Sequence, residues 1–365
     1  MLDSITPPKG FKKIFKRHNQ EQKNEIHEKM PKKFNKKKLI IWSAIIIILL
    51  VPTFYLFKTG SAFSKIITIK NIAWEKIFGK IPDAEYTPAK DENRINFLLL
   101  GIRGEEEVNV GGWLTDAIMI ASIEKSTGKI ALISIPRDLY LQMPGEVAYE
   151  KINTVYAIGS QKYENGLDYA KKTIAYVTGI YIDHATEINF DAFKDIIEIL
   201  GGVTIYLDKP FAENRQWGCD AMGKNCIPFE LSAGEHTLNG ESALLYVRSR
   251  FSSSDFERVR RQQQVLMAIK DRVLSLGILS DPLKISGIID VLSKNIKTDI
   301  SPWEIPELMK LANNVKTDNI IRRVFENSPE GMLYESKING IYVLLPTDTT
   351  FNKIREACQN IFKLD

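Results

Sequence analysis

One stretch of the chain, residues 39–57, contains nineteen consecutive residues without a charged side chain. A helix of that length spans about 28 Å, close to the hydrocarbon thickness of a bilayer. Three lysines at 36–38 precede the stretch, and the positive-inside rule places such residues on the cytoplasmic side. We therefore predict a single-pass protein of the cell membrane. Residues 1–38 would form a basic cytoplasmic tail, and the chain after residue 57 would be extracytoplasmic.

A cleaved signal peptide and a buried core helix are the alternatives to this anchor. Gly60-Ser61-Ala62 has the small residues of a cleavage site. However, the basic region and the apolar run are both longer than in ordinary signal peptides, and so uncharged a run is not typical of a core helix. We favour a retained signal anchor at 39–57, a juxtamembrane stalk at 58–92 and a compact domain at 93–365.

The net charge of +4 is unevenly distributed. The first 38 residues hold twelve Lys/Arg and four Asp/Glu, or +8, and the remaining 37 Lys/Arg and 41 Asp/Glu give −4. The tail has no helix-turn-helix pattern, and membrane topology with attraction to anionic lipid accounts for its charge. We therefore expect membrane lipid, and no nucleic acid, as a partner.

The domain after residue 92 alternates between two apolar patterns. Short apolar runs predict strands at 95–102, 117–123, 129–135, 185–189, 203–207 and 341–345. Helical periods or helix-stop signals predict helices near 154–158, 167–178, 190–200, 271–276, 291 and 306–311, and from 350. This alternation is typical of a layered α/β domain.

The strands 117–123 and 129–135 are joined by a turn at 125–128, which predicts a hairpin. Counting outward from the turn centre places Asp116 opposite Arg137, at the open end of the hairpin. One carboxylate and one guanidinium would therefore face each other just beyond the strands. A structural salt bridge is the alternative to a functional pair.

The stretch 243–266 concentrates arginine. Residues 243–250 are predicted as a short strand, on which Arg248 and Arg250 would share a face. Capping residues at 252–255 then predict a helix start.

On that helix, a 100° step places Val259, Leu266, Ile269 and Val273 on one core stripe. A neighbouring stripe carries Arg258, Arg261 and Gln262, whereas Arg260 points to solvent. Guanidinium groups and a helix N-terminus together favour a multiply charged anion such as a phosphate. A solvated basic helix face is the alternative.

The three cysteines do not predict a metal site. Cys219 and Cys226 lie in one polar loop, where a local disulfide is permitted outside the cytoplasm. The sequence leaves open whether they are bonded. The four histidines form no cluster, so zinc is not expected.

Several short motifs occur in an order that resembles the LytR–CpsA–Psr family of bacterial envelope enzymes. They are Asn96–Gly101, Thr115-Asp116, Ser134–Asp138, Lys151–Asn153, Leu200–Val203, Leu238–Leu244 and Arg248-x-Arg250 through Arg261-Gln262-Gln263.

The resemblance implies a central mixed sheet with helices on both faces and an apolar pocket for a polyprenyl chain. It also implies a phosphotransferase that moves a glycopolymer from a polyprenyl-pyrophosphate carrier to peptidoglycan, usually assisted by Mg²⁺. Asp116 would hold the metal or activate the acceptor hydroxyl. The pyrophosphate ligands implied are Arg137, Arg248, Arg250, Arg258, Arg261 and Gln262, of which Arg137, Arg250 and Arg261 are also candidate catalytic residues with Asp116.

The chain departs from the family pattern at two motifs. Gly101-Ile102-Arg103 stands where the family has Gly-x-Asp, and Leu114–Ala117 stands where it has Arg-Ser-Asp-Thr. We expect Arg103 to add positive charge beside the pyrophosphate. The lost acidic position also keeps open a non-catalytic lipid-pyrophosphate or glycan-binding protein, or a regulator. The sequence does not identify the glycopolymer.

Overall fold

The computed structural model describes residues 77, 87–104, 111–219, 224–278, 288, 295–315, 320–327 and 331–363. No helix within these residues is long and apolar enough to cross a membrane. The predicted tail, anchor and most of the stalk lie outside the described residues, so the topology remains a prediction. The helix expected near residue 291 also lies outside them.

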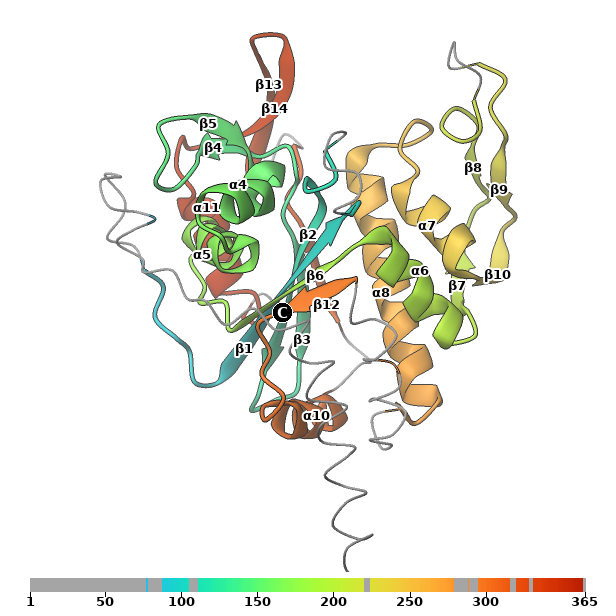
Figure 1. Ribbon diagram of the computed structural model, residues 1–365, viewed down its shortest axis with the longest axis horizontal. Helices are drawn as coiled ribbons and strands as arrows, with labels where there is room; N and C mark the ends of the chain where they lie inside the picture. The colour runs from blue at the N-terminus through green and yellow to red at the C-terminus, as the bar shows by residue number, and fades with distance from the viewer. Residues whose placement is uncertain are drawn as a thin grey trace, which may run out of the picture. The chain divides into compact units, whose positions relative to one another are not determined.

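A six-stranded sheet forms the centre of the domain (Figure 1). Its strand order is β11-β6-β1-β2-β3-β12. Strand β1 pairs with β2 antiparallel and with β6 parallel, and β3 pairs with β12 parallel, so the sheet is mixed as expected. The strands are β1 (Arg94–Ile102), β2 (Thr115–Glu124), β3 (Ile130–Ser134), β6 (His184–Ile188), β11 (Ile296–Thr298) and β12 (Ile321–Val324).

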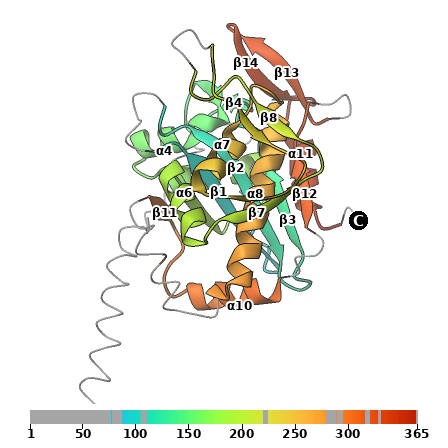
Figure 2. The ribbon, with the colours of Figure 1, turned by 90° about the vertical axis from the view of Figure 1, so that its right-hand side faces the viewer.

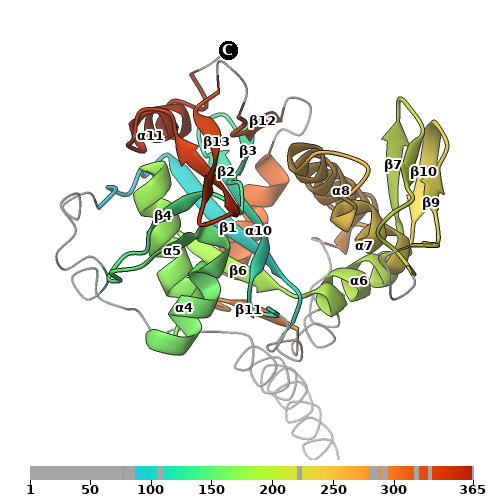
Figure 3. The same ribbon diagram turned by 90° about the horizontal axis from the view of Figure 1, so that it is seen from above.

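Helices cover both faces of this sheet (Figure 3). One layer consists of α4 (Val155–Lys162), α5 (Gly166–Thr178) and α11 (Asn352–Gln359). The other layer, which Figure 2 views from outside, consists of α6 (Phe190–Ile199), α7 (Gly240–Arg248) and α8 (Asp255–Ser275). Helix α10 (Ile305–Asn314) lies near one end of the sheet (Figure 1). The layered α-β-α architecture is therefore confirmed.

The two faces of β1 have different surroundings. Leu98 and Leu100 are buried in the core formed with α4, α5 and α11. Leu99 and Gly101, which alternate with them, are only half-buried and face the layer of α6, α7 and α8. A separate apolar cluster joins α6, α7 and α8 to β7 (Val203–Leu207) and β10 (Gly234–Leu238). One face of the sheet is thus filled more completely than the other.

The strand predicted at 243–250 is wrong, because these residues continue helix α7 to Arg248. The Asn239 side chain caps the helix by accepting a hydrogen bond from the Ser242 N–H, and Leu244 and Val247 lie on its buried face. Eight residues of mostly apolar sequence do not distinguish a strand from a short helix. Arg248 and Arg250 therefore do not share a strand face.

Helix α8 begins as predicted. The Ser254 side chain accepts a hydrogen bond from the Glu257 N–H at 3.1 Å, and the helix runs unbroken through the separate helix predicted at 271–276. Val259 is buried, and Leu266, Ile269 and Val273 are partly buried against apolar clusters. Arg260 is half exposed and pairs with Glu257 and Glu326, as expected for the solvent side.

Short hairpins complete the domain. They are β4–β5 (Tyr140–Gln142, Tyr149–Lys151), β8–β9 (Phe211–Glu213, Phe229–Leu231) and β13–β14 (Leu333–Ile338, Ile341–Pro346). The connection between β8 and β9 is closed by a disulfide between Cys219 and Cys226, which resolves the open question about these cysteines.

Candidate functional site

A cavity of about 290 Å³ lies between the less filled face of the sheet and helices α6, α7 and α8. Most of its wall is apolar. The apolar lining comprises Leu99, Leu100, Ala117, Met119, Ile188, Phe190, Phe193, Ile196, Leu244, Val247, Phe251, Leu266 and Ile269. A cavity of this composition suits a hydrocarbon ligand.

The polar lining of the cavity is dominated by arginine. Five guanidinium groups and one carboxylate contribute to it, together with three amide side chains. These residues are Arg103, Arg137, Arg248, Arg250, Arg258, Asp116, Asn189, Gln216 and Gln262. Six of the seven residues predicted to bind pyrophosphate therefore lie on one cavity; the exception is Arg261.

Asp116 and Arg137 meet as the hairpin register predicts. Met119 pairs with Ser134, so continuing the same antiparallel register places Asp116 opposite Arg137. Arg137 Nη1 donates to Asp116 Oδ1 at 2.5 Å, and Arg103 Nε lies 3.8 Å from Asp116 Oδ2. One carboxylate thus orients two of the cavity arginines.

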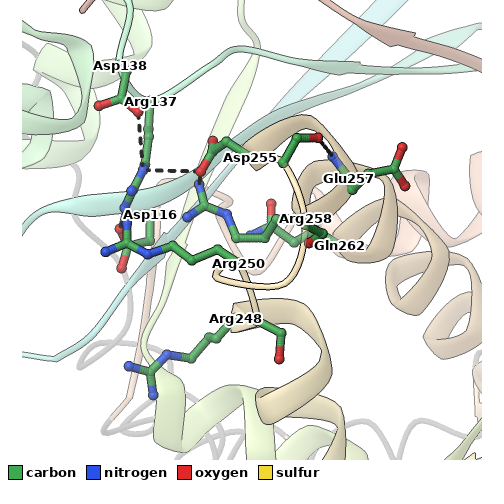
Figure 4. A network of polar contacts seen from close by, with 12 residues as sticks. Asp116, Arg137, Asp138, Arg248, Arg250, Asp255, Glu257, Arg258 and Gln262 are labelled. Carbon is green, nitrogen blue, oxygen red and sulfur yellow. Dashed lines mark hydrogen bonds and ion pairs between the residues drawn. The ribbon is translucent and has the colours of Figure 1, made fainter. Parts of the chain in front are cut away.

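Arg137 is also close to two further carboxylates. Its Nε lies 3.7 Å from Asp138 and 3.8 Å from Asp255 (Figure 4). Burial alone would lower the pKa of Arg137, but Asp116, Asp255 and Asp138 together raise it. The buried Nε has no hydrogen-bond partner. Arg137 therefore stays charged and retains a donor.

Arg258 is the most deeply buried of the cavity arginines, with 4% of its surface exposed. Its Nη2 lies 2.8 Å from Asp255, at the first turn of the same helix. Burial lowers the pKa of Arg258 to about 10; Asp255 opposes this change, and Arg137 and Arg250 add to it. Its Nε is likewise buried without a hydrogen-bond partner. A buried cation among like charges is stabilised by a bound anion.

Arg248 ends helix α7, and Arg250 lies in the turn that follows. The Arg248 guanidinium is 4.3 Å from the ring centre of Phe190 and 5.3 Å from that of Trp217. Figure 4 shows the guanidinium groups of Arg137, Arg250 and Arg258 gathered on one side of the turn, with Asp116 beside them. The guanidinium groups therefore meet because Arg248 ends helix α7 and Arg250 follows in the turn, and not because residues 243–250 form a strand.

Arg261 does not line the cavity, contrary to the expected shared stripe with Arg258. Its Nε donates to the Tyr246 carbonyl at 3.0 Å, and its other nitrogens bind Ser249 O and Ser253 Oγ. Burial lowers the pKa of Arg261. These three hydrogen bonds hold the turn between α7 and α8, and the contact of Arg261 with a pyrophosphate stays a prediction.

The donor set fits a resident metal ion poorly. Asp116 is the single carboxylate among the described lining residues, and two arginines already neutralise it. No group of three metal-ligating side chains occurs in the described part of the chain. Mg²⁺ prefers several oxygen ligands, so the described residues supply too few. The arginines are the groups that can neutralise a bound anion here.

Three polar residues of the site were missed by the sequence analysis as participants, and one of them is Asn189, which lines the cavity where it caps helix α6. Asp255 links Arg137 to Arg258, and its place in the first helical turn was read only as a cap. Gln216 lines the cavity from the segment after β8. No local pattern marks Gln216, because a long connection brings it to the arginines.

Comparisons with known proteins identify relatives over most of the domain. The LytR_cpsA_psr family matches residues 63–360. The polyisoprenyl-teichoic acid–peptidoglycan teichoic acid transferase TagT of Bacillus subtilis (strain 168) is 32% identical over 255 residues, which cover 68% of this chain and 73% of TagT. TagU of Oceanobacillus iheyensis, of the same description, is 28% identical over 271 residues, or 73% and 75% of the two chains.

A solved structure supports the fold. The structure of TagT bound to LIIa-WTA superposes with a TM-score of 0.56 at 24% identity, covering 81% of this chain and all of that chain. At this identity the likeness extends to the fold alone, and it agrees with the mixed sheet and its helix layers. With the match over residues 63–360, the chain belongs to the LytR_cpsA_psr family.

Proposed function

We propose that this protein is a phosphotransferase that moves a glycopolymer from a polyprenyl-pyrophosphate carrier to peptidoglycan. The observation that carries the proposal is that five arginines line the same cavity as a large set of apolar side chains. A polyprenyl diphosphate has the same two parts, a hydrocarbon chain and a compact multiple anion. The activity named for the TagT and TagU relatives supports this assignment.

The reaction forms one bond and breaks one. An acceptor hydroxyl of peptidoglycan attacks the phosphorus that carries the glycopolymer, and the phosphoanhydride bond breaks. The polymer is then joined through a phosphodiester, polyprenyl phosphate leaves, and the hydroxyl proton is released. Such transfers depend on positioning and on neutralising oxygen charge.

The arginines divide this work by position. Arg137 and Arg258, each with a buried Nε that has no hydrogen-bond partner, are placed to bind the diphosphate oxygens, and Arg250 reaches the same cavity from the turn. Asp116 orients Arg137 and is the one described lining carboxylate that can accept the hydroxyl proton. A magnesium ion would have Asp116 as its one protein carboxylate, and no step assigned here requires it.

The membrane anchor belongs to the same proposal. Residues 39–57 would hold the domain outside the cytoplasm, at the surface of the bilayer that contains the lipid carrier. In intact protoplasts, added protease should digest the domain and leave a tag at residue 1 protected; a protected domain would contradict this orientation.

Transfer is tested with the purified full-length chain, a polyprenyl-pyrophosphate-linked glycopolymer and peptidoglycan sacculi. We expect polymer attached to peptidoglycan through a phosphodiester, with release of polyprenyl phosphate. Arg250→Ala should abolish most of this product. Binding of the lipid without any product in the wild type would instead favour a non-catalytic binding protein.

That binding function is the second candidate, because Arg103 lies beside Asp116 where a further acidic group would be needed for metal chemistry. The two functions differ only in turnover. Both require that the cavity bind a polyprenyl diphosphate, so binding data alone do not separate them.

A further inference from the structure

The turn between α7 and α8 begins directly after Arg248 and carries Arg250. It lacks the regular backbone hydrogen bonds of a helix or a sheet. Its exposed backbone groups therefore need partners from elsewhere. Most of the partners come from one segment, residues 213–217, which leaves strand β8 and runs along the turn. Nothing in this segment takes part in the chemistry assigned above.

Gln216 makes two hydrogen bonds that span the two arginines. Its Nε2 donates to the Arg248 carbonyl at 3.0 Å, and its Oε1 accepts from the Arg250 N–H at 2.8 Å. A carboxamide offers a donor and an acceptor side by side, which a carboxylate does not. The side chain thus fixes the backbone on both sides of Ser249.

Neighbours of Gln216 reinforce the same turn. Trp217 Nε1 donates to Ser249 Oγ at 3.2 Å, and its ring lies 5.3 Å from the Arg248 guanidinium. Glu213 is fully buried and accepts hydrogen bonds from the Ser252 N–H at 3.0 Å and from Ser252 Oγ at 2.9 Å. Burial alone would raise the pKa of Glu213, but these hydrogen bonds and others from backbone N–H groups lower it.

The segment is itself held by the β8–β9 hairpin. The Ile227 N–H donates to the Trp217 carbonyl at 2.8 Å, and the disulfide between Cys219 and Cys226 closes the connection beyond it. Residues 213–217 are therefore held by a hairpin that a disulfide closes.

We propose that Gln216 is a positioning residue of the diphosphate site, and that residues 213–217 form a clasp that holds Arg248 and Arg250 toward the cavity. This inference rests on the proposed function. Long arginine side chains lose conformational entropy when they converge on a ligand, and a fixed backbone lowers that cost.

The test measures binding of inorganic pyrophosphate and the kcat and KM of transfer, in the full-length chain. Gln216→Ala should weaken pyrophosphate binding about tenfold, because Arg248 and Arg250 are no longer held toward the cavity, and the loss of two hydrogen bonds should also lower the unfolding midpoint. Gln216→Glu loses the donor and adds a negative charge to the cavity, so it should bind pyrophosphate no better than Gln216→Ala. Gln142→Ala, a glutamine bonded to a backbone carbonyl away from the cavity, is the matched control.

A double-mutant cycle separates positioning from general stabilisation. In an Arg250→Ala background, Gln216→Ala should cost clearly less binding than in the wild type, because one of the groups it positions is gone. Unchanged binding in Gln216→Ala, or full additivity with Arg250→Ala, would overturn the clasp and leave the proposed function standing. A wild-type chain that neither binds pyrophosphate nor transfers polymer would overturn both.

Discussion

The two faces of the central sheet are built from the same strands but differ in how they are filled. On one face Leu98, Leu100 and Ile102 pack against α4, α5 and α11 with almost no exposed surface. On the other, Leu99 and Gly101 border a cavity that α6, α7 and α8 roof over. The alternation of side chains along β1 therefore divides the domain into a face for stability and a face for a ligand.

The charged groups follow the same division. At the cavity face Arg103, Arg137 and Arg258 share three carboxylates, Asp116, Asp138 and Asp255. The buried Nε atoms of Arg137 and Arg258 have no hydrogen-bond partner. The filled face contains a buried Lys172 matched to Asp168 at 2.7 Å. The Lys172 charge on the filled face is thus matched within the protein, whereas Arg137 and Arg258 at the cavity each leave a buried donor for a ligand.

The largest expected effect is a loss of transfer activity when an arginine of the cavity face is removed. Arg137→Ala should lower kcat by about a hundredfold to a thousandfold, because it removes one preorganised donor to the reacting phosphate and the hydrogen-bond partner of Asp116. The transfer assay measures it. Arg260→Ala, which removes an exposed arginine of α8 on the solvent side, is the control and should retain activity. An active Arg137→Ala would remove the cavity face from the chemistry.

A pair of substitutions compares the faces by stability. Leu98→Ala, on the filled face, should lower the free energy of unfolding by about 3 kcal/mol, as for other buried leucines. Ala117→Leu, on the cavity face, should change it by less than about 1.5 kcal/mol, because the added atoms enter space that the ligand would occupy. Chemical denaturation measures both values.

In ligand affinity the order of these two substitutions should be reversed, with Ala117→Leu having the larger effect. Ala117→Leu is expected to weaken a long polyprenyl diphosphate about tenfold, or ~1.4 kcal/mol, and to leave inorganic pyrophosphate unaffected. Leu98→Ala should change neither affinity in the folded protein. Equal losses of both ligands in Ala117→Leu would mean that the hydrocarbon chain lies elsewhere.

The sequence was sufficient for features set by local rules. The turn at 125–128 determined the hairpin register, and hence the contact between Asp116 and Arg137. Serine capping marked the start of α8, and Gly179 ended α5 with a positive φ of 68°. Each of these depends on neighbours within a few residues.

Features that depend on tertiary packing were not predictable in the same way. Arg261 lies near Arg258 by helical angle, but its side chain turns to the carbonyl groups of the preceding turn. The edge strands β11 and β12 have three and four residues, too short for a period to emerge. Gln216 reaches its arginines across more than thirty residues of sequence.

A pH series should sharpen the electrostatic part of the comparison. A bound anion stabilises protonated Arg258, so its pKa in the complex must exceed the value of about 10 in the free protein. Pyrophosphate affinity should therefore be complete below that pH and fall as pH rises through it, by at most about tenfold per unit for one linked proton. Titration calorimetry measures the slope. Arg258→Gln should lack that part of the slope, and an identical slope in both proteins would assign it to another group.

Metal removal should give the smallest effect, because five arginines and a single carboxylate line the described cavity. Chelation with EDTA is expected to lower the transfer rate by less than about threefold, or ~0.65 kcal/mol. Arg103→Asp would place a second carboxylate beside Asp116, and should make both the rate and the unfolding midpoint respond to added Mg²⁺. A hundredfold loss of wild-type activity on chelation would mean that a metal ion, and not the arginines, neutralises the charge of the bound diphosphate. The two faces of the sheet would then differ in having or lacking a cavity, and not in how a bound anion is neutralised.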